Sequence, residues 1–125
     1  MTVPVPATLN LTLMSSKLQN YVRTHRRRAG LSQKEMAFLL GCTSEAKVSR
    51  YERFVRQPTL ETVLAYEAIF GAPARELFAG VYERARAEIQ NRARALSENL
   101  DGENTDASTA RKREFLNRVA SYKPF

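Results

Sequence analysis

Apolar residues recur at every third or fourth position along most of the chain from residue 16 onward. This spacing lines one face of an α-helix, and it predicts a series of helices joined by short polar turns. The first helix is expected to begin at Ser16 and to stop at Gly30, because glycine readily adopts the left-handed conformation that ends helices. Its apolar face is expected to contain Leu18, Tyr21, Val22, His25 and Ala29.

A second helix is predicted from residues that satisfy the free amides of a helix start. Ser32 and Glu35 fit a capping box, in which each side chain accepts a hydrogen bond from the backbone amide of the other residue. Gln33 and Lys34 lie between them, in the first helical turn. The inward positions of this helix are expected to be Met36, Ala37 and Leu40.

A third helix is expected only a few residues beyond the second. Gly41 permits a left-handed or otherwise tight backbone between the two helices. Either Thr43 or Ser44 can cap the new helix with its hydroxyl group. The helix is expected to run through Tyr51 or Glu52.

The fourth predicted helix opens with Pro58 and Thr59, and Thr59 is its expected cap. Gly71 is expected to end it, after which Leu77 and Phe78 close the core. The apolar side of this helix is expected to contain Leu60, Val63, Leu64, Tyr66 and Phe70.

Two more helices are predicted beyond residue 80. A long amphipathic helix extends to Leu100, the polar stretch 101–106 breaks it, and a last helix extends from about Thr109 to Tyr122. The long helix is expected to align Tyr82, Ala85, Ile89, Ala93, Leu96 and Leu100, and the last helix Phe115, Leu116, Val119 and Tyr122.

The N-terminal residues follow a different pattern, because Leu9, Leu11 and Leu13 alternate with polar residues as in a β-strand. They are expected to form either a flexible tail or a β-arm that pairs with another chain, and Met14 is a second candidate for the natural start. The whole pattern predicts an all-α fold in three parts, namely an arm over 1–14, a helical domain over 15–80 and a helical C-terminal extension over 81–125.

The positive charge is concentrated in one third of the chain. The net charge is +7, and the segment 17–56 holds ten basic and three acidic residues, so that the charges elsewhere cancel. A basic excess confined in this way is typical of a surface that binds a polyanion, most often nucleic acid.

Other functional classes receive little support from the composition. No apolar run approaches the roughly 18 residues that span a bilayer, so we expect no membrane protein. The N-terminus lacks a secretory signal pattern and Cys42 has no second cysteine to pair with, which favours a reducing cytoplasm. With one histidine, one cysteine and no glycine-rich phosphate loop, we expect no enzyme, no metal and no cofactor.

Three blocks of sequence resemble a known family. They are Leu31-Ser32-Gln33-Lys34-Glu35-Met36-Ala37-Phe38-Leu39-Leu40-Gly41, then Val48-Ser49-Arg50-Tyr51-Glu52, then Pro58-Thr59-Leu60-Glu61-Thr62-Val63. In this order they are similar to the Cro and lambda-repressor-like helix-turn-helix family, also called the xenobiotic-response-element family. The resemblance covers about residues 18–78 and implies a five-helix bundle whose third helix enters the major groove of DNA.

The chain departs from the family pattern in two places. It has one more residue than usual between Gly41 and Val48, which we place at Cys42 or Thr43 so that Ser44 caps the third helix. It also has Arg53-Phe54 where the family often has Asn-Gly, so the turn after the third helix is made without glycine.

The N-terminal part of the third helix is expected to read base edges in the major groove. Arg50 suits guanine because its guanidinium can donate to both O6 and N7, Glu45 can accept from cytosine, and Ala46 can contact the methyl group of thymine. The expected base-reading residues are Ser44, Glu45, Ala46, Lys47 and Arg50. The expected phosphate-binding residues are Gln33, Lys34, Arg26, Arg27, Arg28, Ser49, Arg53 and Arg56.

The resemblance therefore implies a sequence-specific transcriptional regulator, most simply a repressor, that binds double-stranded operator DNA. Because one such domain reaches only a few base pairs, we expect a homodimer on two half-sites about 34 Å apart. The dimer contact can come from the long helix between Val81 and Leu100, from the last helix or from the N-terminal arm with Leu9, Leu11 and Leu13. The alternative hypothesis is an antitoxin, in which residues 81–125 bind a toxin protein and the helix-turn-helix regulates its own promoter.

Overall fold

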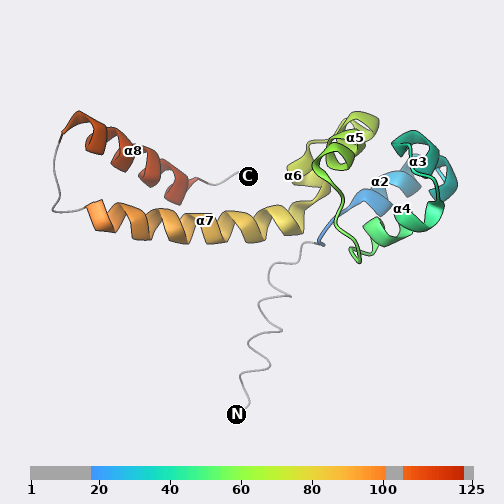
Figure 1. The fold of residues 1–125 in the computed structure, drawn as a ribbon, viewed down its shortest axis with the longest axis horizontal. Helices are drawn as coiled ribbons and strands as arrows, with labels where there is room; N and C mark the ends of the chain where they lie inside the picture. Colours follow the sequence, from blue (N-terminus) through green and yellow to red (C-terminus); the bar gives the residue numbers. More distant parts are fainter. Residues whose placement is uncertain (1–17, 101–105, 123–125) are drawn as a thin grey trace, which may run out of the picture. The chain divides into compact units, whose positions relative to one another are not determined.

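The computed structural model describes residues 18–100 and 106–122, and these residues form helices and no strand (Figure 1). The all-α fold expected from the sequence is confirmed. The chain divides into two compact units, Met1–Tyr82 and Glu83–Phe125. The helices are α2 (Val22–Arg28), α3 (Gln33–Leu40), α4 (Glu45–Glu52), α5 (Leu60–Phe70), α6 (Ala74–Leu77), α7 (Ala79–Leu100) and α8 (Ala107–Ser121).

The expected caps of three helices are confirmed. The Ser32 hydroxyl accepts a hydrogen bond from the Glu35 amide at 3.0 Å, and the Glu35 carboxylate accepts one from the Ser32 amide at 2.8 Å. The Ser44 hydroxyl accepts from the Ala46 amide at 3.0 Å, which makes Ser44 and not Thr43 the cap of α4. Thr59 caps α5 in the same way. In each helix the hydroxyl accepts from a backbone amide of the first turn that has no carbonyl partner within the helix.

The first helix begins at Val22, and the expected start at Ser16 is wrong. The chain before it is held by tertiary hydrogen bonds: the Tyr21 amide donates to the Leu77 carbonyl at 2.6 Å, and the Asn20 amide group donates to the Tyr51 carbonyl at 3.0 Å. Asn20 also accepts from the Val22 amide at 3.2 Å, which satisfies one free donor of the helix start. Leu18, expected on the apolar face, is exposed.

The core of the first unit takes one fully buried side chain from each of its five helices. Val22, Met36, Val48, Tyr66 and Leu77 come from α2, α3, α4, α5 and α6 in turn. Aromatic rings pack edge to face around Tyr66, with the Tyr51 ring centroid at 6.5 Å and that of Phe78 at 6.1 Å. The expected inward positions of α3 and the expected closure of the core by Leu77 and Phe78 are confirmed.

The expectation for the apolar side of α5 is wrong at two positions. Leu60 is 73% exposed and Leu64 is 51% exposed. Because successive residues turn by about 100° around a helix, Leu64 lies about 200° from the buried Tyr66 and faces away from the core. The apolar character of α5 is therefore not confined to its buried side.

The turn after α4 adopts a positive φ without glycine. Gly30, Gly41 and Gly71 follow α2, α3 and α5 with φ between 69° and 77°, and Phe54 follows α4 with φ of 56°. The Val55 amide donates to the Arg50 carbonyl at 2.9 Å and thereby closes the helix end. A side chain in this conformation is strained by about 1 kcal/mol, so the neighbouring contacts must hold the turn in place.

The second unit pairs α8 with the second part of α7. The Gln90 amide group donates to the Tyr122 carbonyl at 2.7 Å, and the Arg113 guanidinium donates to the Leu100 carbonyl at 2.9 Å. Ala93 and Leu100 are buried here, whereas Ile89 and Leu96 are exposed. The single apolar stripe expected on α7 is therefore wrong, because its members lie on two different faces of the helix.

The last helix spans Ala107–Ser121, close to the expected bounds, and the Asp106 carboxylate caps it by accepting from the Thr109 amide at 2.8 Å. This bond lowers the pKa of the Asp106 carboxyl group. Phe115 and Tyr122 are more than half exposed, contrary to the single apolar side expected for this helix. None of the described helices combines the length and the apolar character of a membrane-spanning segment.

Candidate DNA-binding interface

The core fixes which side of α4 faces solvent. Val48 and Tyr51 are buried against the other helices, and this places the opposite side of α4 at the surface. Glu45, Ala46 and Arg50 are exposed on that side. The expected base-reading residues are thus brought together on one exposed helix, with Ser44 at its cap and Lys47 half-buried beside them.

Glu52, at the end of α4, joins three segments of the first unit. Its carboxylate accepts from the Arg26 guanidinium at 2.6 Å and 3.2 Å, and from the Gln33 side-chain amide at 3.1 Å. The Arg26 guanidinium also donates to the Leu31 carbonyl at 2.8 Å. The Glu52 side chain is only 2% exposed, so this network holds α2, α3 and α4 together from inside the domain.

Arg26 is not available as a phosphate contact, and that expectation is wrong. The residue is buried, and each of its three guanidinium nitrogens donates to Glu52 or to the Leu31 carbonyl. Sequence reasoning grouped it with the adjacent Arg27 and Arg28, which are exposed. The difference arises because Arg26 lies on the inner face of α2, toward a carboxylate 26 positions later in the chain.

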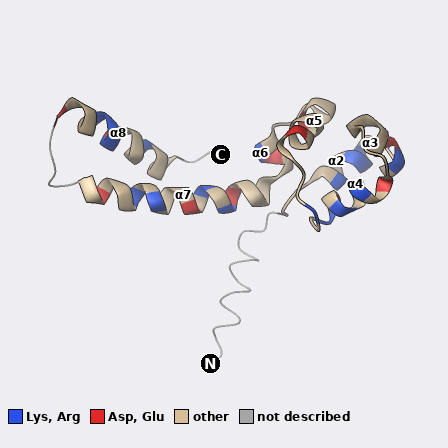
Figure 2. Ribbon diagram, viewed as in Figure 1, with Lys and Arg blue, Asp and Glu red and all other residues tan. Residues whose placement is uncertain are grey.

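The other expected phosphate contacts lie at the surface or beside it. Gln33 is half-buried at the start of α3, where its side-chain nitrogen donates to Glu52. Ser49 is also half-buried, and its hydroxyl accepts from the Arg53 guanidinium at 3.2 Å. Figure 2 shows Lys and Arg on α2 and α4. The exposed cations of the set are Arg27, Arg28, Lys34, Arg53 and Arg56.

Two positioning residues, Asn20 and Glu52, were missed as parts of the site. Both are polar side chains in or beside predicted helices, and each makes its bonds to a segment far along the chain. The only sequence feature that could have pointed to Asn20 and Glu52 is that each is a polar residue at the edge of an apolar helix pattern. Asn20 holds the Tyr51 carbonyl and Glu52 holds Arg26 and Gln33, so together they fix the C-terminal end of α4.

Two further titratable side chains of the first unit, Tyr66 and His25, pack in its interior or against another ring. Burial, followed by the charge of Glu52, raises the pKa of the Tyr66 hydroxyl, which stays neutral at physiological pH. The His25 ring packs against the Phe70 ring with centroids 5.4 Å apart. Among the described residues, no group of three or more His, Cys, Asp or Glu side chains is placed to hold a metal ion.

Comparison with known proteins identifies the first unit. Residues 19–79 match the family of the helix-turn-helix domain. No curated protein and no solved structure matched the chain. The matched segment contains α2 to α6, including the exposed face of α4 and the network around Glu52. A domain of this family implies DNA binding and a role in transcription regulation. Residues 19–79 of this chain are a helix-turn-helix domain of the Cro and lambda-repressor-like type.

Proposed function

We propose that the protein is a sequence-specific transcriptional repressor that reads the major groove with α4. The observation that carries this proposal is the exposure of Glu45, Ala46 and Arg50 on a helix whose other side is locked into the core. A helix that the core already holds rigid needs no further ordering of its backbone when it binds DNA. Binding across a promoter would exclude the polymerase and so repress transcription.

Each side chain on the exposed face of α4 matches a feature of base edges. Arg50 donates with both sides of its guanidinium to guanine O6 and N7. Glu45 accepts from the amine of cytosine, and Ala46 packs against the methyl group of thymine. The Ser44 hydroxyl accepts from the Ala46 amide and so keeps its proton to donate to DNA, and Lys47 adds a cation at the same edge.

Phosphate contacts fix the register of α4 on the duplex without reading sequence. Gln33 and Lys34 lie in the first turn of α3, where free amides and the helix dipole favour an anion. The further phosphate contacts in this proposal are Arg27, Arg28, Ser49, Arg53 and Arg56.

The proposed repressor acts as a homodimer on two half-sites. Ile89 and Leu96 lie seven residues apart on α7 and remain about half exposed after α8 has packed. This spacing returns to the same side of a helix after two turns, as in helices that pair in coiled coils. The second unit thus has apolar side chains available for a second copy of the chain.

Selection of binding sequences from random duplex DNA tests this function. We expect one enriched sequence that repeats in inverted orientation, because a two-fold dimer reads the same half-site twice. Affinity for that sequence should fall as salt rises, since exposed cations release counterions on binding. Binding without sequence enrichment would contradict the proposal.

A further inference from the structure

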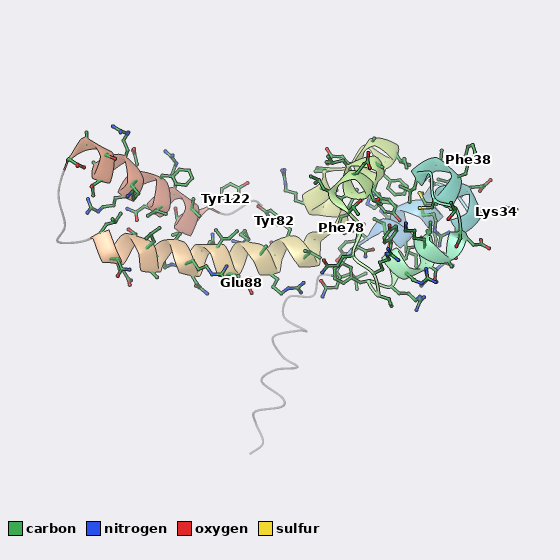
Figure 3. All side chains as sticks on the ribbon, in the orientation of Figure 1. Lys34, Phe38, Phe78, Tyr82, Glu88 and Tyr122 are labelled. Atoms are coloured by element: carbon green, nitrogen blue, oxygen red, sulfur yellow. The ribbon has the colours of Figure 1, made fainter. Side chains whose placement is uncertain are left out.

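The outer face of α8 alternates guanidinium groups with aromatic rings. Arg111, Phe115, Arg118 and Tyr122 follow one another at steps of four, three and four residues, which is the spacing of a single helix face. Phe115 is 56% exposed and Tyr122, directly after the helix, is 51% exposed, and both arginines are exposed. Figure 3 shows Tyr122 at the end of α8. We call these four residues the α8 outer face.

The α8 outer face joins α7 only through the backbone carbonyl of Tyr122, which accepts from the Gln90 amide group, and among the described residues its side chains make no hydrogen bond to α7. The remaining contacts to α7 come from the adjoining sides of α8, where Leu116 and Val119 are half-buried. There the Arg113 guanidinium donates to the Leu100 carbonyl, and the Gln90 amide group donates to the Val119 carbonyl at 3.3 Å. The rings of Phe115 and Tyr122 therefore expose apolar surface to water, which is unfavourable, and this exposed surface does not stabilise the pair of helices.

The charges of α8 favour an anionic partner. The helix contains four basic residues and one acidic residue. The Arg118 guanidinium lies over the Phe115 ring, 5.7 Å from its centroid, in a cation–π contact. Within residues 18–100 and 106–122, no carboxylate forms an ion pair with Arg111 or Arg118. Both guanidinium groups can therefore bind anions from outside the chain.

We propose that the α8 outer face binds single-stranded nucleic acid, with the arginines on phosphates and the rings stacked on bases. Single strands offer unpaired base faces to aromatic side chains, and a basic surface follows their backbone. Phe115 and Tyr122 are about 10 Å apart along the helix axis, so the two rings reach different bases of one strand. A duplex keeps its base faces stacked, and an acidic peptide would engage the arginines but leave the rings without partners.

This activity is separate from the duplex reading proposed for α4. It concerns a unit outside the residues matched to the helix-turn-helix family, and it uses base faces in place of base edges. Failure of one proposal therefore leaves the other standing.

Fluorescence anisotropy of the full chain with labelled twelve-nucleotide oligo-dT and oligo-rU tests the proposal. Phe115→Leu removes the ring but keeps an apolar side chain, and Arg118→Ala removes a cation. We expect each substitution to weaken binding roughly 10-fold, in line with the stacking and charge contributions of such surfaces. The matched control Arg92→Ala changes an exposed arginine of α7 and should stay within about two-fold of the wild type.

Comparing the affinities for the two oligonucleotides shows whether the site prefers DNA or RNA, because the preferred ligand is the one with the lower dissociation constant. Phe115→Tyr, which keeps the ring, should bind as the wild type does. Affinity for a random duplex should not change in Phe115→Leu, and circular dichroism should show that the helices remain. Absence of binding by the wild type would overturn the proposal. So would a Phe115→Leu variant that binds normally, because the site would then recognise charge alone.

Discussion

The two units of the chain bury their helices in different ways. Met1–Tyr82 draws a fully buried side chain from each of five helices and encloses an ion pair between Arg26 and Glu52. Glu83–Phe125 buries Ala93 and Leu100 and also joins its helices through side chains that donate to backbone carbonyls. A large shared core holds side chains in fixed positions, as base reading requires, whereas a thin helical pair leaves apolar and aromatic side chains available to partners.

The largest expected difference between the units concerns their ion pairs. Glu52→Ala leaves the buried Arg26 without its partner and should lower the free energy of unfolding of the first unit by about 3–5 kcal/mol. Glu83→Ala, which removes the more exposed pair with Arg86, should cost less than about 1 kcal/mol. Urea unfolding followed by circular dichroism measures both. Equal losses in the two variants would show that the Glu52 network does not hold the domain.

Shortening an apolar side chain should also lower the free energy of unfolding more in the first unit than in the second. Met36→Ala removes a fully buried side chain and should cost about 2–5 kcal/mol. Ile89→Ala, on the exposed side of α7, should change the free energy of unfolding by less than about 0.5 kcal/mol in the monomer. Thermal unfolding of the two variants at the same low concentration compares them. A large loss in Ile89→Ala under these conditions would mean that the second unit is packed more fully than the structure shows.

The exposed side of α7 should control self-association. Replacing Ile89 and Leu96 together by glutamate places charges where two chains would meet, and it should weaken the dimer at least about 10-fold. Phe115→Glu on α8 is the matched control and should leave the dimer intact. Sedimentation equilibrium gives the dissociation constants. A double variant that dimerises as the wild type does would assign the contact to another part of the chain.

The smallest expected effect is a pH dependence confined to the first unit. Tyr66 has its pKa raised above the ordinary value of 10.0 by burial, so above about pH 10 the unfolded chain loses this proton while the folded chain keeps it. Stability is therefore lost as pH rises, by about 1 kcal/mol for each pH unit above 10. Urea unfolding of the wild type and Tyr66→Phe at pH 9 and pH 11 measures this. A Tyr66→Phe variant that loses as much stability as the wild type would refute the assignment.

Local signals in the sequence predicted the helix caps and most helix ends. Ser32, Ser44 and Thr59 each bond to an amide two or three residues away, so a short window of sequence contains the whole interaction. Gly41 and Gly71 likewise adopt a left-handed conformation, which a glycine can do without contacts from other parts of the chain. These features do not depend on the tertiary fold.

The features that the sequence did not predict depend on distant partners. Arg26 has the same local setting as Arg27, and only the position of Glu52 in the folded domain decides which one is buried. The start of the first helix was misplaced because Leu77 and Tyr51 hold the residues before Val22 outside the helix. Periodicity alone also could not show that Ala93 is buried while Ile89 stays exposed.

Repeating the duplex selection with Arg50→Ala tests the central claim most directly. The exposed face of α4 should lose discrimination at one base-pair position of each half-site, with a cost of about 1–3 kcal/mol at the preferred guanine and little change elsewhere. Arg92→Ala, an exposed arginine of α7, is the matched control and should select the same sequence as the wild type. An Arg50→Ala protein that kept full discrimination at every position would contradict the reading of DNA by α4.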